Sequence, residues 1–130
     1  MAIHILLADD EKDFVDTLAE RLKIRDFSVR VVYNGLDAIA AVRDSRPDVV
    51  ILDLYMPGLS GDETLQQMAA LHKNLPVILL TGQAGVEESF AKIEAVNCAC
   101  LTKPVALNQL LEKIGELLQG TQHSVGGDNA

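Results

Sequence analysis

The sequence contains no tryptophan and few other aromatic residues, so aromatic side chains make up only 4% of the chain. Its core must therefore pack mainly through the valine, isoleucine, leucine and alanine side chains that dominate the 48% of hydrophobic residues. The 130 residues fit one domain, and a chain of this size buries roughly two-thirds of its unfolded surface. Such a domain needs neither disulfides nor a structural metal to stay folded.

Cysteine is also scarce, and the two cysteines, Cys98 and Cys100, are separated by one residue. This spacing places both side chains on the same side of a strand, where a disulfide between them rarely closes. We interpret both as small hydrophobic residues rather than as metal ligands or redox groups.

Basic residues are outnumbered, with 11 lysines and arginines against 19 acidic residues and a formal net charge of −8. This excess of negative charge argues against direct nucleic-acid binding by this segment. No apolar run approaches the ~20 residues of a membrane span, and Met1 leads into a short apolar run rather than a basic signal-peptide region. We therefore expect a cytoplasmic protein that does not bind membranes.

Short apolar runs alternate with segments whose apolar residues recur at helical spacing. The strict alternation predicts an α/β domain with a doubly wound, five-stranded parallel sheet of order 2-1-3-4-5 and helices on both faces. We expect this domain to cover residues 1–120 and residues 121–130 to be a flexible tail or linker stub. The expected strands are residues 3–8, 28–33, 49–53, 77–80 and 98–102, and the helical patterns follow them near residues 14–24, 36–40, 65–72, 86–93 and 107–118.

Polar residues stand where four of these strands end. Asp9 and Asp10 follow the first strand, Asp53 ends the third, and Thr81 and Lys103 follow the fourth and fifth. In the order 2-1-3-4-5 these ends meet at one edge of the sheet. Three carboxylates there need a cation, and an oxygen-only ligand set favours Mg²⁺. A metal, an ammonium, a hydroxyl and a carboxylate nucleophile are the groups that phosphoryl transfer to an aspartate requires.

As a set, these motifs resemble the response-regulator receiver domain of two-component signalling, which has the flavodoxin-like fold. The resemblance extends from residue 3 to about residue 118. The motifs that carry it are Asp9-Asp10, Asp53-Leu54-Tyr55-Met56-Pro57-Gly58, Thr81-Gly82 and Lys103-Pro104.

The resemblance implies that Asp53 is the phosphoacceptor. It also implies a Mg²⁺ ion bound directly by Asp10, Asp53 and the backbone carbonyl of Tyr55, with Asp9 acting through a metal-bound water. Such domains catalyse their own phosphorylation and dephosphorylation, so the term enzyme applies to them only loosely.

For the phosphoryl group itself, the resemblance implies contacts from Thr81 and Lys103, and a cis peptide bond between Lys103 and Pro104. The phosphoryl donor would be a phosphohistidine on a sensor histidine kinase or on a phosphotransfer protein. Phosphorylation would then switch a surface that binds a downstream output domain or protein, or that forms a phosphorylation-dependent homodimer.

One position departs from the family pattern. Receivers usually carry a tyrosine or phenylalanine three residues before the lysine, where this chain has Cys100. The phosphorylation chemistry does not need that ring, but the usual aromatic readout and dimerisation through it are in question. A receiver-like interaction module that works without phosphorylation therefore stays open as an alternative, and Mg²⁺-dependent phosphorylation of Asp53 would distinguish the two.

An enzyme with the same kind of intermediate fits less well. A phosphatase of the haloacid dehalogenase type carries an Asp-x-Asp-x-Thr pattern after its first strand, whereas this chain has Asp9-Asp10-Glu11-Lys12-Asp13. A flavin-binding domain of the same topology would need a phosphate-binding loop at that position, where three acids would repel the phosphate.

Overall fold

The computed structural model describes residues 2–82 and 96–126, and its strands form a five-stranded parallel sheet of order β2-β1-β3-β4-β5. The predicted fold class and strand order are therefore confirmed. The strands are β1 (His4–Ala8), β2 (Ser28–Val32), β3 (Val49–Asp53), β4 (Leu75–Thr81) and β5 (Val96–Thr102). The described helices are α1 (Lys12–Ile24), α2 (Gly35–Asp44), α3 (Gly61–Leu71) and α5 (Leu107–Gly126).

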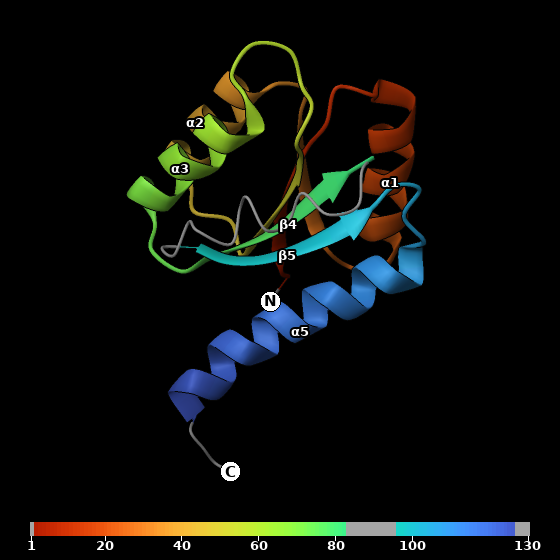
Figure 1. The fold of residues 1–130 in the computed structure, drawn as a ribbon. Coiled ribbons are helices and arrows are strands. Elements are labelled where there is room, and N and C mark those ends of the chain that lie inside the picture. The colour runs from red at the N-terminus through yellow and green to blue at the C-terminus, as the bar shows by residue number, and fades with distance from the viewer. Residues whose placement is uncertain (1, 83–95, 127–130) are drawn as a thin grey trace.

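Helices cover both faces of the sheet, with α2 and α3 on one face and α1 and α5 on the other (Figure 1). Leu6 of β1 belongs to the core on the α2 and α3 side together with Leu65. The next residue, Leu7, belongs to the opposite core together with Leu110 of α5. Because successive side chains of a strand point to opposite faces, a strand covered on both sides is apolar at every position. This explains the continuous apolar runs of the sequence.

Two glycines bring α3 against the end of the central strand β3. Gly58 has a φ of 87°, a conformation that glycine adopts without the steric cost of a side chain. At Gly61, the first residue of α3, an added Cβ would lie 2.7 Å from the Leu54 carbonyl oxygen. The chain can therefore turn sharply after Asp53 and begin α3 next to the strand it has just left.

The starts of α2 and α3 are capped by side chains. Asn34 accepts a 2.8 Å hydrogen bond from the backbone N–H of Asp37. Ser60 accepts one from the N–H of Glu63 and donates its hydroxyl to the Glu63 carboxylate, both at 3.1 Å. The Ser-x-x-Glu spacing is the sequence signature of this second cap, which our sequence analysis did not use.

Two strands begin earlier than the apolar runs predicted. β4 starts at Leu75 rather than residue 77, and β5 starts at Val96 rather than residue 98. The two strands pair in register from Leu75–Val96 to Thr81–Thr102. Pro76 and Asn97 interrupt the apolar runs, but the pairing of the two strands, which sets their length, continues past them to Leu75 and Val96.

The last helix also differs from its predicted length. Its apolar pattern predicted a helix to about residue 118, but α5 continues to Gly126, through part of the segment expected to be a tail. A helix is held by backbone hydrogen bonds four residues apart, which do not require an apolar side chain in each turn. The C-terminal half of α5 extends beyond the sheet (Figure 1). The helix predicted near residues 86–93 lies outside the described residues.

The two cysteines pack as small hydrophobic residues, although they are half-buried rather than fully buried. Cys98 and Cys100 are free thiols on β5 and pack against the core on the α2 and α3 side. Burial raises the pKa of the Cys98 thiol to about 12, and the neighbouring Cys100 adds to this rise. Cys98 is therefore protonated, and a poor nucleophile, at neutral pH.

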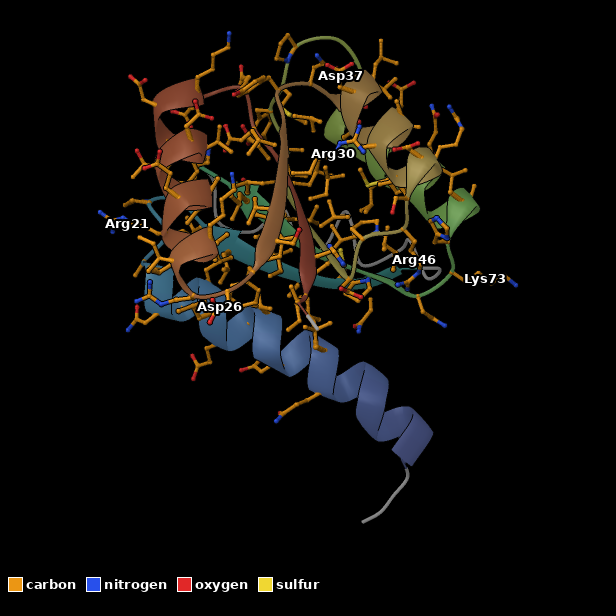
Figure 2. The ribbon with its side chains drawn as sticks, turned by 180° about the vertical axis from the view of Figure 1, so that it is seen from behind. Arg21, Asp26, Arg30, Asp37, Arg46 and Lys73 are labelled. Atoms are coloured by element: carbon orange, nitrogen blue, oxygen red, sulfur yellow. The ribbon has the colours of Figure 1, made fainter. Side chains whose placement is uncertain are left out.

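Charged side chains lie on the outer surfaces of the helices and on the edge strand. Figure 2 shows Arg21 on α1 and Lys73 after α3 pointing away from the sheet. Arg30 of β2 forms an ion pair with Asp44 of α2, with 3.2 Å between Nη1 and Oδ2. Among the helices that the structure describes, none is long and apolar enough to cross a bilayer.

Candidate functional site

The register of the sheet places the predicted site residues at one edge. Asp9 and Asp53 stand at the ends of neighbouring strands, β1 and β3, and Thr81 and Lys103 stand at the ends of β4 and β5. The backbone N–H of Lys103 donates a 2.7 Å hydrogen bond to the Thr81 carbonyl, which fixes the two strand ends to each other. The last register pairs before this edge are Ala8–Leu52, Asp53–Leu80 and Thr81–Thr102.

Three carboxylates converge at this edge, as the sequence predicted. One oxygen from each of Asp9, Asp10 and Asp53 lies within 4.8 Å of the others. The Asp9 side chain is fully buried and Asp53 is 4% exposed, whereas Asp10 is exposed. Two of these acids are therefore buried and the third is exposed, and we refer to this cluster of three carboxylates at the carboxyl edge of the sheet as the crevice.

Backbone N–H groups hold one oxygen of each buried carboxylate. Glu11 N–H donates to Asp9 Oδ1 at 2.9 Å, and Tyr55 N–H donates to Asp53 Oδ1 at 3.2 Å. The second oxygens, both Oδ2, lie 3.0 Å and 3.5 Å from Nζ of Lys103. Asp9 Oδ2 is buried, and its ion pair with Lys103 lacks the alignment of a hydrogen bond. It therefore has unused capacity to interact with a cation.

Lys103 also contacts two residues at the start of α1 that our sequence analysis did not assign to the site. Its ammonium lies 2.5 Å from Glu11 Oε1 and 5.1 Å from the centroid of the Phe14 ring. Burial lowers the pKa of Lys103, but the hydrogen bond to Glu11 and the charges of Asp9 and Asp53 outweigh it, so the pKa lies above the ordinary value. Lys103 is therefore a permanent cation.

The sequence alone does not indicate that Lys103 contacts Glu11 and Phe14. Glu11 is one of several acids in the segment Asp9-Asp10-Glu11-Lys12-Asp13, and Phe14 is one of the apolar residues of α1. Glu11 and Lys103 are 92 positions apart, so only the fold can show that they meet.

Burial raises the pKa of Asp53 to about 6. The hydrogen bond from the Tyr55 N–H and the charge of Lys103 lower this pKa, whereas the charge of Asp9 raises it. At pH 7 most Asp53 carboxyl groups are therefore ionised and carry the lone pairs of a nucleophile.

The donor set fits a hard divalent cation. All three converging groups are carboxylates, and two of them are buried. The single positive charge of Lys103 does not balance the negative charges of these three carboxylates and of Glu11. Carboxylate oxygens with one open, exposed side suit an ion that keeps part of its water shell, as Mg²⁺ does. The three carboxylates could therefore hold a divalent cation.

Two further predictions concern the backbone. The Lys103–Pro104 peptide bond is cis, as the resemblance implied. The Tyr55 side chain is 59% exposed beside Asp53, and the role of its carbonyl as a metal ligand stays a prediction. The Thr81 side chain is fully buried at the end of β4.

Together, the fold and the crevice define a doubly wound α/β domain that carries its polar groups at the carboxyl edge of the sheet, where such folds bind their ligands. The sequence model of the response regulator receiver domain matches residues 5–115. The chain belongs to this family, whose members are the receiver domains of two-component systems.

Similar proteins agree with this assignment. The chain is 33% identical over 129 residues to response regulator MprA of Mycobacterium sp. strain KMS, covering 99% of this chain and 56% of that protein. It is also 33% identical to response regulator MprA of Mycobacterium tuberculosis H37Rv over 122 residues, covering 94% of this chain and 53% of the relative. The chain thus spans about half the length of these relatives.

Solved structures show the same fold. A CheY-like response regulator receiver domain protein from Methanospirillum hungatei JF-1 aligns with a TM-score of 0.86 and 25% identity, covering 95% of this chain and 99% of that one. NtrX from Brucella abortus aligns with a TM-score of 0.82 and 28% identity, covering 95% of this chain but 29% of NtrX.

Proposed function

We propose that this domain accepts a phosphoryl group on Asp53. The observation that carries the proposal is the buried Asp53 carboxylate, which lies beside two further carboxylates and within 3.5 Å of the Lys103 ammonium. An ionised carboxylate oxygen of Asp53 attacks the phosphorus of the donor. A new P–O bond forms to Asp53. The bond between the phosphorus and the leaving group breaks, and its electron pair stays with the leaving group.

Mg²⁺ is the proposed cofactor; Asp10, Asp53 and the backbone carbonyl of Tyr55 would hold it directly, and Asp9 would hold it through a bound water. When bound, the ion neutralises negative charge on the phosphoryl oxygens and on the acids that would otherwise repel them. Lys103 supplies a second positive charge for the same oxygens.

Thr81 is proposed to donate its hydroxyl to the phosphoryl group once this group is in place. The group on Asp53 thereby acquires contacts at the ends of both β4 and β5. These new contacts favour one of two conformations of the partner-binding surface, because they exist only in the phosphorylated state.

The proposed donor is a phosphohistidine on a sensor histidine kinase or a phosphotransfer protein, and the proposed receiver of the signal is an output domain or protein. The proposed location is the cytoplasm, where such a kinase would present its phosphohistidine. A phosphorylation-dependent homodimer is a further proposed form of the output, although Cys100 occupies the position of the usual aromatic residue.

Intact-mass spectrometry after incubation with acetyl phosphate tests the proposal. We expect a gain of one phosphoryl group, about 80 Da, in the wild type with Mg²⁺ and no gain without Mg²⁺. Asp53→Asn should show no gain, whereas Asp13→Asn, which removes an exposed acid of the first turn of α1, should react as the wild type does.

The test also separates the alternative function. An unmodified wild type, in an experiment repeated with a phosphorylated kinase as the donor, would contradict the proposal and favour an interaction module that works without phosphorylation. A gain that persists in Asp53→Asn would place the phosphoryl group on another residue.

A further inference from the structure

The Lys103 ammonium lies closer to the start of α1 than to the proposed phosphoacceptor. Its Nζ is 2.5 Å from Glu11 Oε1 and 3.0 Å from Asp9 Oδ2, but 3.5 Å from Asp53 Oδ2. The Phe14 ring lies on the same side, with its centroid 5.1 Å from Nζ, within range of a cation–π attraction. The side chain is therefore held on the α1 side of the crevice.

Glu11 differs from the other acids that contact Lys103. It is not one of the three converging carboxylates, and its side chain is 62% exposed. Only its backbone N–H supports the crevice, through the hydrogen bond to Asp9 Oδ1. The Glu11 carboxylate can therefore be changed without removing a proposed metal ligand or a buried contact.

We propose that Glu11 is a positioning residue that holds the Lys103 ammonium toward the start of α1, at 3.5 Å from Asp53, while Asp53 is unphosphorylated. The inference rests on the proposed function of Asp53. In this proposal, Lys103 exchanges the Glu11 carboxylate for a phosphoryl oxygen when Asp53 is phosphorylated. The pair thus stabilises the unphosphorylated state only, which lowers the population of the switched state.

Binding of beryllofluoride, a phosphoryl analogue, tests the energetic part of the proposal. At saturating Mg²⁺, calorimetry should show that Glu11→Gln binds the analogue about threefold to fivefold more tightly than the wild type, the scale of one partly screened ion pair. Asp13→Asn is the matched control, because it removes one negative charge from the first turn of the same helix, and its affinity should change by less than about 1.5-fold.

Glu11→Asp refines the comparison, because it keeps the charge but shortens the side chain by one methylene group. Its affinity should fall between those of the wild type and Glu11→Gln. Equal tightening by Glu11→Gln and Asp13→Asn would overturn the proposal, because the effect would then come from the general negative field. Weaker binding by Glu11→Gln would overturn it as well.

A second measurement does not depend on phosphorylation. In the unphosphorylated protein without Mg²⁺, the NMR signals of the Lys103 amino group, identified by their loss in Lys103→Arg, should shift in Glu11→Gln and not in Asp13→Asn. If the wild type accepts a phosphoryl group but these signals stay unchanged in Glu11→Gln, the inference fails and the proposed function stands. If the wild type accepts no phosphoryl group, the proposed function fails, and the inference with it.

Discussion

Asp53 occupies a position where burial raises its pKa and a nearby positive charge lowers it. Its position on a strand buried at every residue brings it next to Asp9, and this burial raises its pKa to about 6. The same position places it 3.5 Å from the Lys103 ammonium, which favours its charged form. The protein therefore keeps an ionised carboxylate at neutral pH at some cost in stability.

This cost predicts that Asp53→Asn raises the free energy of unfolding by an amount that depends on the pH. The folded pKa of about 6 lies above the ordinary value of 3.8, so the folded state binds the extra proton and stability falls as the pH rises between about 4 and 6. In metal-free buffer at pH 7, the variant should unfold with a free energy about 1–2 kcal/mol higher than that of the wild type. Urea denaturation at several pH values measures this.

The gain should disappear below about pH 4, where both states of the wild type are protonated. Asp13→Asn, at an exposed position, serves as the control and should change little at any pH. A gain that is equally large at low pH, or no gain at pH 7, would contradict the electrostatic account of Asp53.

Lys103→Ala should separate metal binding from switching. The variant keeps all three converging carboxylates, so it should still bind Mg²⁺, but it loses the cation proposed to contact the phosphoryl group. We expect the backbone amide spectrum of the phosphorylated variant to stay close to that of its unphosphorylated form. Lys113→Ala, which removes an ion pair with Glu116 on α5, should switch normally. A full phosphorylation-dependent change in Lys103→Ala would exclude the proposed role of Lys103.

At the scale of the elements, the site depends on how sharply the chain turns between β3 and α3. Gly58 adopts a positive φ, and Gly61 allows the first turn of α3 to approach the Leu54 carbonyl. The cap formed by Ser60 then satisfies a backbone N–H at the start of the helix. These features place Tyr55 so that its N–H can orient the Asp53 carboxylate.

Ser60→Ala removes the cap of α3 and should lower the free energy of unfolding by about 1 kcal/mol. Ser60→Asn, which can still accept a hydrogen bond from the N–H of Glu63, should lose much less. Chemical denaturation of the two variants beside the wild type checks this prediction. Equal losses in both would show that the Ser60 hydroxyl contributes through something other than capping.

At the scale of the whole molecule, negative charge is in excess, with a formal net charge of −8. Part of this excess is concentrated in the crevice, where Asp9, Asp53 and Glu11 pair with one lysine, Lys103, and Asp10 lies within 4.8 Å of Asp9 and Asp53. A cation that binds to these carboxylates in the folded state, and not in the unfolded state, stabilises the folded protein by mass action.

Mg²⁺ should therefore raise the melting temperature of the wild type by about 10 °C at a concentration about one hundred times its Kd. Sodium chloride at the same ionic strength should give a much smaller shift, because screening acts on all charges and not on the crevice in particular. Asp10→Asn should reduce the Mg²⁺ shift strongly. Equal shifts from both salts would argue against a metal site in the crevice.

Much of this arrangement could be predicted without coordinates. The alternation of apolar runs and helical patterns determined the fold class, because a strand covered on both faces must be apolar at successive positions. The polar residues after four strands, Asp9, Asp53, Thr81 and Lys103, then indicated one shared edge, since parallel strands end on the same side. The cis bond before Pro104 followed from the family resemblance and is confirmed.

Other features were decided by the tertiary structure alone. The extent of β4 and β5 depends on their pairing, and the partners of Lys103 depend on how the start of α1 meets the end of β5. The apolar pattern of a segment indicates which of its residues are buried, because burial repeats regularly along a strand or a helix. An ion pair between residues 92 positions apart depends on a distance that only the assembled sheet and helices define. The sequence by itself therefore determined which groups stand at the edge of the sheet, and the tertiary structure determined that Glu11 holds the lysine among them.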